Sequence, residues 1–425
     1  MMRKKLILLS FLLLAISLQA QTIRDEINRN IHLSAGSAVA YHHAVQHWLT
    51  PAPEGKKPFY ISHFGRYGSC YLDKADTYEL PRKILVSADS LGKLTPLGRE
   101  VLERLDRICQ GAHERWGELT ALGASQQRDI IKRMVERFPE VFADGSDIDA
   151  RSTTRNACIL SMEYAMMQLS MMNPKVKIHH NTTRRDMSYL NQPNHLVMDS
   201  ASQAAYDNFS HRMKDSERMV NMLFNDTAYL HRSVDIRQLN DCLFKVASSI
   251  QSTELCNRLT LYDLFTDEEI YDYWRKENAW WYAVGGSFTV NGCKQPYTQR
   301  NLLHKMIEQA DSIMLRNRPC ASLRWGQETS LLPLVCLLGI NGYGDAADNL
   351  ESLERRGWCD YKIIPMSGNV QLVFYRNGLE DDDVLVKVLL NENEATLPLK
   401  SDIAPYYHWR DVREYYLEKC NNVKM

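Results

Sequence analysis

Residues 58–68 place a short apolar run directly before a turn that contains two glycines. The run, Pro-Phe-Tyr-Ile-Ser at 58–62, is rich in aromatic and β-branched residues, which favour a strand. The next six residues, His-Phe-Gly-Arg-Tyr-Gly at 63–68, mix glycine with charged and polar groups, as tight turns do. The chain is therefore expected to fold around a strand that delivers Arg66 and Tyr67 to a glycine-rich loop.

Further strands and helices alternate along the chain. Thr95 and Pro96 are a typical N-cap and first residue of a helix, and helical patterns also cover 115–137, 158–172, 331–340 and 409–419. Strand patterns occur at 321–326 and at 370–375 and 384–390, which flank Asn377-Gly378 as a hairpin. This alternation predicts an α/β core from 21–172 and 318–425, whereas the short polar and aromatic helices of 173–317 predict an all-helical insert.

Composition excludes several classes of function. The 425 residues carry a net charge of −1, with 51 Lys and Arg against 52 Asp and Glu. We therefore predict no nucleic-acid partner, and any anion site must be local.

Residues 1–20 combine a basic start with an apolar run from Leu6 to Leu18, which predicts a signal peptide cleaved after Ala20. The mature protein is expected to be exported, periplasmic or secreted, without a membrane anchor.

Metal and cofactor signals are weak. The ten cysteines permit disulfides whose pairing the sequence does not give, and Cys158 and Cys336 lie in apolar patterns that favour buried free thiols. His43 and His47 have helical spacing, but no third ligand is well placed, which favours a surface pair. Because phosphate-loop and dinucleotide fingerprints are absent, we predict no metal and no cofactor.

The methionines of 162–172 are expected to pack in the hydrophobic core.

Five segments together resemble the histidine acid phosphatase branch of the histidine phosphatase superfamily, and within it the multiple inositol polyphosphate phosphatase-like proteins. They are residues 63–71, 94–98, 151–153, 323–328 and 364–372, in the order of that family. The resemblance implies a phosphoglycerate-mutase-like, three-layer α/β/α core with an inserted helical cap. It also implies a phosphate pocket where a His nucleophile accepts the phosphoryl group and several Arg neutralise it.

Several residues that carry this chemistry in the family are replaced. Arg66 matches the first Arg of the Arg-His-Gly-x-Arg motif, but Tyr67 stands at the nucleophile and Cys70 at the second Arg. By the same resemblance, Arg151 matches the third phosphate-binding Arg. At the acid motif, Gln327 stands at the second His, and Glu328 keeps a carboxyl as a candidate acid.

Each of these residues also has a structural interpretation. Arg66 and Arg151 are either anion ligands or members of ion pairs with Glu328 or another carboxylate. A Tyr with a pKa near 10 is ionised in roughly one molecule in a thousand at neutral pH, which disfavours Tyr67 as a nucleophile. Cys70 lacks the Arg that a cysteine phosphatase places six residues later, and His63 is better suited to ordering the turn than to attacking phosphorus.

The leading hypothesis is a catalytically impaired, exported protein of the inositol-polyphosphate-phosphatase-like group. It would still bind a phosphorylated small molecule or another anion through Arg66 and Arg151. Two alternatives remain open. One is an active, phytase-like phosphomonoesterase that uses Tyr67 as nucleophile or Glu328 to activate water. The other is a non-catalytic interaction or scaffold protein that contacts its partner through the helical cap.

Overall fold

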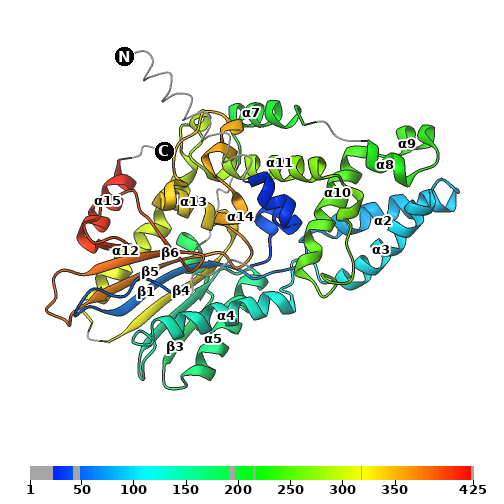
Figure 1. Cartoon of the computed structure of the whole chain (residues 1–425). Coiled ribbons are helices and arrows are strands. Elements are labelled where there is room, and N and C mark those ends of the chain that lie inside the picture. The colour runs from blue at the N-terminus through cyan, green and yellow to red at the C-terminus, as the bar shows by residue number, and fades with distance from the viewer. Residues whose placement is uncertain (1–22, 42–47, 191–196, 214–216, 317, 423–425) are drawn as a thin grey trace, which may run out of the picture.

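An eight-stranded mixed sheet runs through the molecule (Figure 1). The computed structural model describes residues 23–41, 48–190, 197–213, 217–316 and 318–422. The strand order is β3-β2-β4-β1-β5-β6-β7, and β8 also pairs with β6. The first four strands are parallel and the rest are antiparallel. The strands are β1 (Lys57–Arg66), β2 (Asp147–Ser152), β3 (Lys177–Asn181), β4 (Cys320–Gly326), β5 (Asn369–Arg376), β6 (Leu385–Leu390), β7 (Asn393–Ala395) and β8 (Tyr406–His408).

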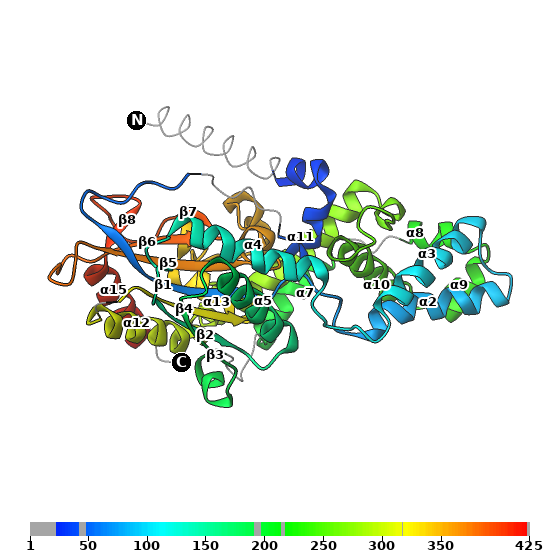
Figure 2. The ribbon, with the colours of Figure 1, turned by 90° about the horizontal axis from the view of Figure 1, so that it is seen from below.

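Helices cover both faces of this sheet. On one face lie α4 (Ala121–Arg137) and α5 (Asn156–Met172), and their apolar side chains share a core with Ile61 and Leu323 of the strands. On the other face lie α12 (Arg300–Met314), α13 (Glu328–Leu338) and α15 (Trp409–Asn421). Figure 2 shows α4 and α5 in front of the strands, with α12 and α15 on the far side. The arrangement confirms the predicted three-layer α/β/α core.

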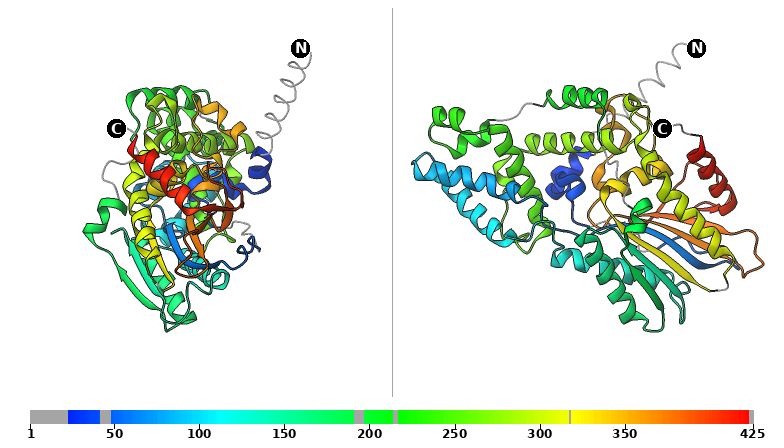
Figure 3. Two further views of the ribbon diagram at one scale, coloured as in Figure 1. Left: turned by 90° about the vertical axis from the view of Figure 1, so that its left-hand side faces the viewer. Right: turned by 180° about the vertical axis from the view of Figure 1, so that it is seen from behind.

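A helical lobe projects from one end of the sheet (Figures 1 and 3). Its apolar core joins α2 (Ala75–Ser90) and α3 (Pro96–Ala112) to helices from much later in the chain. Those later helices are α8 (Arg218–Leu223), α9 (Thr227–Ser233), α10 (Ile236–Ser249) and the start of α11 (Asp267–Gly285). The remaining α-helices of the described residues are α6 (Met187–Leu190), α7 (Ser200–Ser210) and α14 (Asp360–Ile363).

The packing of this lobe differs from the predicted division of the chain. The segment 173–317 includes β3 and α12, which belong to the sheet and one of its covering layers. Conversely, α2 and α3 lie outside that segment but pack against α8 and α10. The amphipathic pattern locates several of the helices, such as α3, α5 and α15, but α2 and α12 were not predicted, and the pattern does not show which apolar surface a helix will meet.

Several local predictions are confirmed. Thr95 caps α3 by accepting a hydrogen bond from the amide of Gly98 at 3.0 Å, with Pro96 at the first helical position. Strands β5 and β6 form the predicted antiparallel hairpin. All ten cysteines are free thiols, and Cys158 and Cys336 are buried. Met162 and Met166 are core residues, but the core prediction is wrong for two other methionines of α5, Met167 and Met171, which are 56% and 76% exposed.

Two predictions fall on residues outside the described part of the chain. His43 and His47 lie outside the described residues, as does the segment 1–20. Within the described part, no group of three or more His, Cys, Asp or Glu could hold a metal ion. Nor does any helix there have both the length and the apolar character needed to cross a bilayer.

The loop after β1 is held tightly by the start of α4. The backbone amide of Thr120, the N-cap of α4, donates a hydrogen bond to the carbonyl of Ser69 at 2.9 Å. The side-chain oxygen of Gln126 accepts a hydrogen bond from the amide of Ser69 at 2.9 Å. Gly68 and Gly123 permit this close approach, because a Cβ added to Gly68 would lie 2.5 Å from the Gly123 carbonyl oxygen. A Cβ on Gly123 would in turn collide with the Ser69 backbone.

We therefore expect Gly123→Ala to push α4 away from the loop. Strain against backbone atoms should lower the free energy of unfolding by about 1–3 kcal/mol. Gly111→Ala in α3 is the matched control, since nothing lies within 4 Å of its added Cβ and alanine favours a helix. Urea denaturation of both variants measures the difference, and equal stability of the two would contradict the contact.

Candidate active site

Three parallel strands end side by side beneath the candidate site. In the register, Arg66 of β1 is paired with Gly326 of β4, and Ser152 of β2 is paired with Trp325. The residues that follow these strand ends therefore come together at one edge of the sheet. They are Tyr67 after β1, Gln327 and Glu328 after β4, and Arg155 after β2.

Arg66 is buried and its guanidinium is surrounded by acceptors. Its Nη1 donates to the backbone carbonyls of Ser37 and Ile364, the latter at 2.7 Å. Its Nε lies 3.1 Å from a carboxylate oxygen of Glu328, and its Nη2 lies 3.4 Å from the phenol oxygen of Tyr67. Nη1 and Nη2 of this guanidinium thus already have acceptors within the protein, and Nε faces the Glu328 carboxylate as an ion pair without forming a hydrogen bond.

Tyr67 lies between two guanidinium groups. The ring centroid is 5.0 Å from the Cζ of Arg66 and 4.4 Å from the Cζ of Arg155, distances typical of cation–π contacts. The side chain is only 3% exposed. Burial, and then the negative charge of Glu328, raise the pKa of the phenol well above its ordinary value despite the two arginines. At neutral pH Tyr67 is therefore a neutral phenol.

Glu328 opens α13 and is ionised. Burial alone would raise its pKa, but Arg66 and Arg155 outweigh that effect, and its own backbone amide and the Tyr67 phenol also hydrogen-bond to it. The pKa of the carboxyl is therefore lowered. An acid needs a proton to give to a leaving group, so this environment opposes the role of general acid proposed for Glu328.

Gln327 and Arg155 form the outer part of the cluster. The Nη1 of Arg155 lies 3.4 Å from the amide oxygen of Gln327, and its Nη2 forms an ion pair with Asp73. The side chain of Asp73 is 56% exposed and that of Arg155 is 23% exposed, whereas that of Arg66 is only 4% exposed. Arg155 is thus the guanidinium of this pair that solvent reaches.

The structure brings Arg155, and not Arg151, to the cluster. Ile148 and Ala150 of β2 face the α4–α5 layer, so Arg151 points from the opposite face of the sheet. There it forms an ion pair with Asp149 at 2.7 Å. The sequence Arg-Ser-Thr-Thr-Arg offers two arginines, and the second follows the end of β2 and precedes the first residue of α5. A strand-to-helix turn is the signal that could have identified Arg155.

The two other candidate nucleophiles are buried and poorly placed. Burial raises the pKa of the Cys70 thiol to about 12, so no thiolate forms at neutral pH. Burial and the charge of Arg324 lower the pKa of His63 to about 3. The His63 ring lies against Trp325, with centroids 5.3 Å apart, and fills the space beside Gly65. The ring thus packs at the turn, but its Nδ1 has no hydrogen-bond partner, so the predicted ordering of the turn by hydrogen bonds of this side chain is not seen.

Comparisons with known proteins identify the fold. No family model and no curated protein matches the chain. Among solved structures, the Bifidobacterium longum multiple inositol polyphosphate phosphatase in complex with inositol hexasulfate has a TM-score of 0.74 and 17% identity, covering 90% of this chain and 97% of that one. The same enzyme in complex with phosphate has a TM-score of 0.73 and 16% identity, covering 92% and 98%.

The phytase from D. castellii is also similar, with a TM-score of 0.67 and 14% identity, covering 93% of this chain and 88% of that one. The chain therefore has the fold of the histidine acid phosphatases over nearly its whole length, as the resemblance implied. Identities this low establish the fold and leave the chemistry to be argued from the residues themselves.

We expect Glu328→Gln to destabilise the protein strongly at neutral pH. The substitution leaves the Arg66 charge buried without its counter-ion, which typically costs about 3–5 kcal/mol. The pKa of Glu328 is lowered in the folded state, so its contribution is present above the ordinary carboxyl pKa of about 4.5 and is lost as pH falls through the lowered value. Denaturant titrations should therefore show the largest difference between wild type and variant at neutral pH.

Glu308→Gln is the control for that measurement. The Glu308 side chain is 68% exposed and lies 3.5 Å from Lys305 at the surface of α12. Its loss should change stability by no more than about 0.5 kcal/mol. If Glu328→Gln were equally mild, the buried ion pair with Arg66 would not stabilise the fold.

Proposed function

We propose that this chain is an exported protein of the histidine acid phosphatase fold whose ability to hydrolyse phosphate esters is impaired. The observation that carries the proposal is Tyr67, a neutral buried phenol enclosed by Arg66, Arg155 and Glu328. It stands at the position where the resemblance implies a histidine nucleophile.

The chemistry of phosphoryl transfer explains why this arrangement is unfavourable. Attack on a phosphate ester needs a nucleophilic lone pair in line with the leaving group and positive charge around the phosphoryl oxygens. A protonated phenol is a poor nucleophile, and the ionised Glu328 neither carries a proton for the leaving group nor, with its lowered pKa, acts as a strong base. The Arg66 guanidinium is already bonded within the protein.

Anion binding at this centre is proposed to depend on Arg155. Its guanidinium is partly exposed, and its carboxylate partner Asp73 is an exposed side chain that can exchange for a ligand. The Bifidobacterium longum enzyme has been crystallised with inositol hexasulfate and with phosphate, so an anionic ligand fits this fold. With Arg66 occupied, a phosphate ester would lose at least one charge-assisted contact, which is typically worth about 1.5–3 kcal/mol.

The decisive assay compares hydrolysis by wild type and by Arg66→Ala. We expect purified wild type to release no phosphate from phytate or p-nitrophenyl phosphate above the level of the Arg66→Ala variant, because Tyr67 stays protonated. A wild-type activity that disappears in Arg66→Ala would establish the alternative, an active phosphomonoesterase with a changed nucleophile.

A triple variant serves as the positive arm of this assay. It combines Tyr67→His, Cys70→Arg and Gln327→His, which restores the family pattern at the three replaced positions. Turnover by this variant alone would show that the scaffold is intact and that these side chains limit the chemistry. Its melting temperature must be recorded, since Cys70 is 6% exposed and an arginine there has to displace its neighbours.

Export is proposed from the basic start and the apolar run of the first twenty residues. When the full-length chain is expressed in a bacterial host, we expect its mature N-terminus to be Gln21 and the protein to leave the cytoplasm. N-terminal sequencing of fractionated cells measures both. Leu12→Arg, which interrupts the apolar run, should keep the uncleaved chain in the cytoplasm, and cleavage or export that is unaffected by this change would contradict the proposal.

A further inference from the structure

A polar pocket lies on the face of the sheet opposite α4 and α5. Its walls come from β2, from residues 183–189 after β3, from α12 and from the end of α15. Its volume is about 860 Å³, which is in the range of small-molecule sites. We call it the α12 pocket. It contains Arg151 but none of Arg66, Tyr67, Arg155 or Glu328, so it is separate from the candidate active site.

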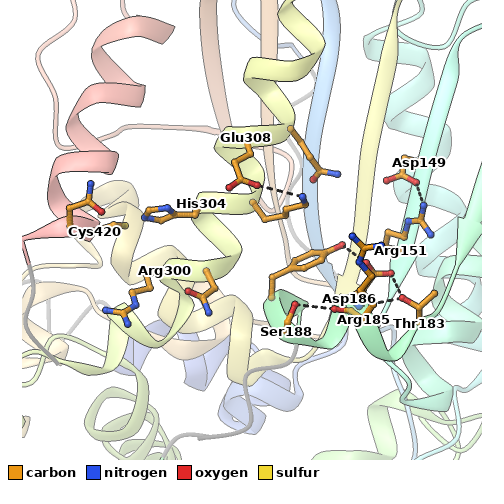
Figure 4. A pocket seen from close by; sticks show the side chains of 15 residues that line it. Asp149, Arg151, Thr183, Arg185, Asp186, Ser188, Arg300, His304, Glu308 and Cys420 are labelled. Atoms are coloured by element: carbon orange, nitrogen blue, oxygen red, sulfur yellow. Dashed lines mark hydrogen bonds and ion pairs between the residues drawn. The ribbon is translucent and has the colours of Figure 1, made fainter.

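Two of the four cationic side chains in the α12 pocket are already paired. Arg151 binds Asp149 at 2.7 Å, and Lys305 lies 3.5 Å from Glu308. Figure 4 shows the contact between Arg151 and Asp149 as a dashed line. The remaining carboxylate, Asp186, accepts a hydrogen bond from Thr183 at 2.7 Å. These contacts account for three carboxylates and two of the cations.

The other two cations, Arg185 and Arg300, have no such partner. Neither guanidinium lies within ion-pair distance of a carboxylate among the described residues. Arg300 belongs to α12 and Arg185 to the segment after β3, so the two come from different walls (Figure 4). His304 lies one helical turn after Arg300 on the same wall. A concave site with two unneutralised guanidinium groups favours a ligand with more than one negative charge.

We propose that the α12 pocket binds a small organic anion with at least two negatively charged groups, which contact Arg185 and Arg300. The anionic groups are phosphate esters or carboxylates, since both match the guanidinium fork. Asp149, Asp186 and Glu308 on the same walls are acceptors for hydroxyl groups, so a hydroxylated ligand such as a polyol phosphate or a hydroxy acid fits the lining.

The same carboxylates make a macromolecular polyanion a poor occupant. A nucleic acid needs a continuous basic surface, whereas here acidic and basic side chains alternate and the whole chain has a net charge of −1. A compact ligand can place its charges on the two arginines and its hydroxyl groups on the carboxylates. The site is thus selective by geometry as well as by charge.

Calorimetric titration of the full-length protein with two probes, inorganic tripolyphosphate and citrate, tests the proposal. At low ionic strength we expect saturable binding of at least one probe, with one equivalent that depends on Arg185 and Arg300. Binding of tripolyphosphate alone assigns phosphate groups to the site, and binding of citrate alone assigns carboxylates. Arg185→Gln with Arg300→Gln should weaken the binding about 100-fold, since each charge-assisted contact is worth about tenfold or more.

Two control variants distinguish binding in the α12 pocket from binding elsewhere on the protein. Arg355→Gln with Arg410→Gln removes the same charge from exposed positions and should change affinity by no more than about twofold. Arg155→Gln removes the charge proposed to bind an anion beside Tyr67, so it should affect only that separate site and leave the equivalent bound by Arg185 and Arg300 unchanged. Absence of binding by both probes, or equal weakening by the first control, would overturn the proposal. Weakening by Arg155→Gln alone would also overturn it and would place the anion beside Tyr67.

Discussion

The buried contact between Arg66 and Glu328 organises the region where the three layers meet. Arg66 ends β1 and reaches the carbonyls of Ser37 and Ile364, which belong to segments far apart in the chain. Glu328 occupies the first turn of α13, where the helix dipole stabilises a carboxylate. Each charge would be costly to bury alone, so each requires the other. The pair therefore fixes the end of the sheet, the start of α13 and the short helix at 31–38 relative to one another.

The phenol of Tyr67 fits beside this ion pair as an uncharged side chain. Its ring lies within cation–π distance of both guanidinium groups, and its hydroxyl helps to lower the pKa of Glu328. Catalytic centres usually hold polar groups in unsatisfied or strained positions, at a cost in stability. Here Arg66 and Glu328 form a buried ion pair, although Arg66 Nε and Glu328 Oε2 have no hydrogen-bond partner.

Sequence patterns predicted individual helices and strands better than they predicted which of these elements pack against one another. The strand before Arg66, the cap at Thr95 and the hairpin around Asn377-Gly378 depend on local chemistry, and the structure shows them. The joining of α2 and α3 to the later helices depends on contacts between distant segments, which no local pattern specifies. The arginine of the site was missed for a similar reason. Arg151 and Arg155 are four residues apart, and only the end of β2 decides that the first faces away and the second reaches Tyr67.

We propose that the side chain at position 67 does not accept a phosphoryl group. Phosphotyrosine is stable enough to survive digestion, so the claim can be tested on the protein directly. The protein would be incubated with phytate or p-nitrophenyl phosphate, quenched in acid and digested, and the peptide that contains Tyr67 measured by mass spectrometry. We expect only the unmodified peptide at every time point. A phosphorylated Tyr67 that appears and then disappears during turnover would contradict the proposal.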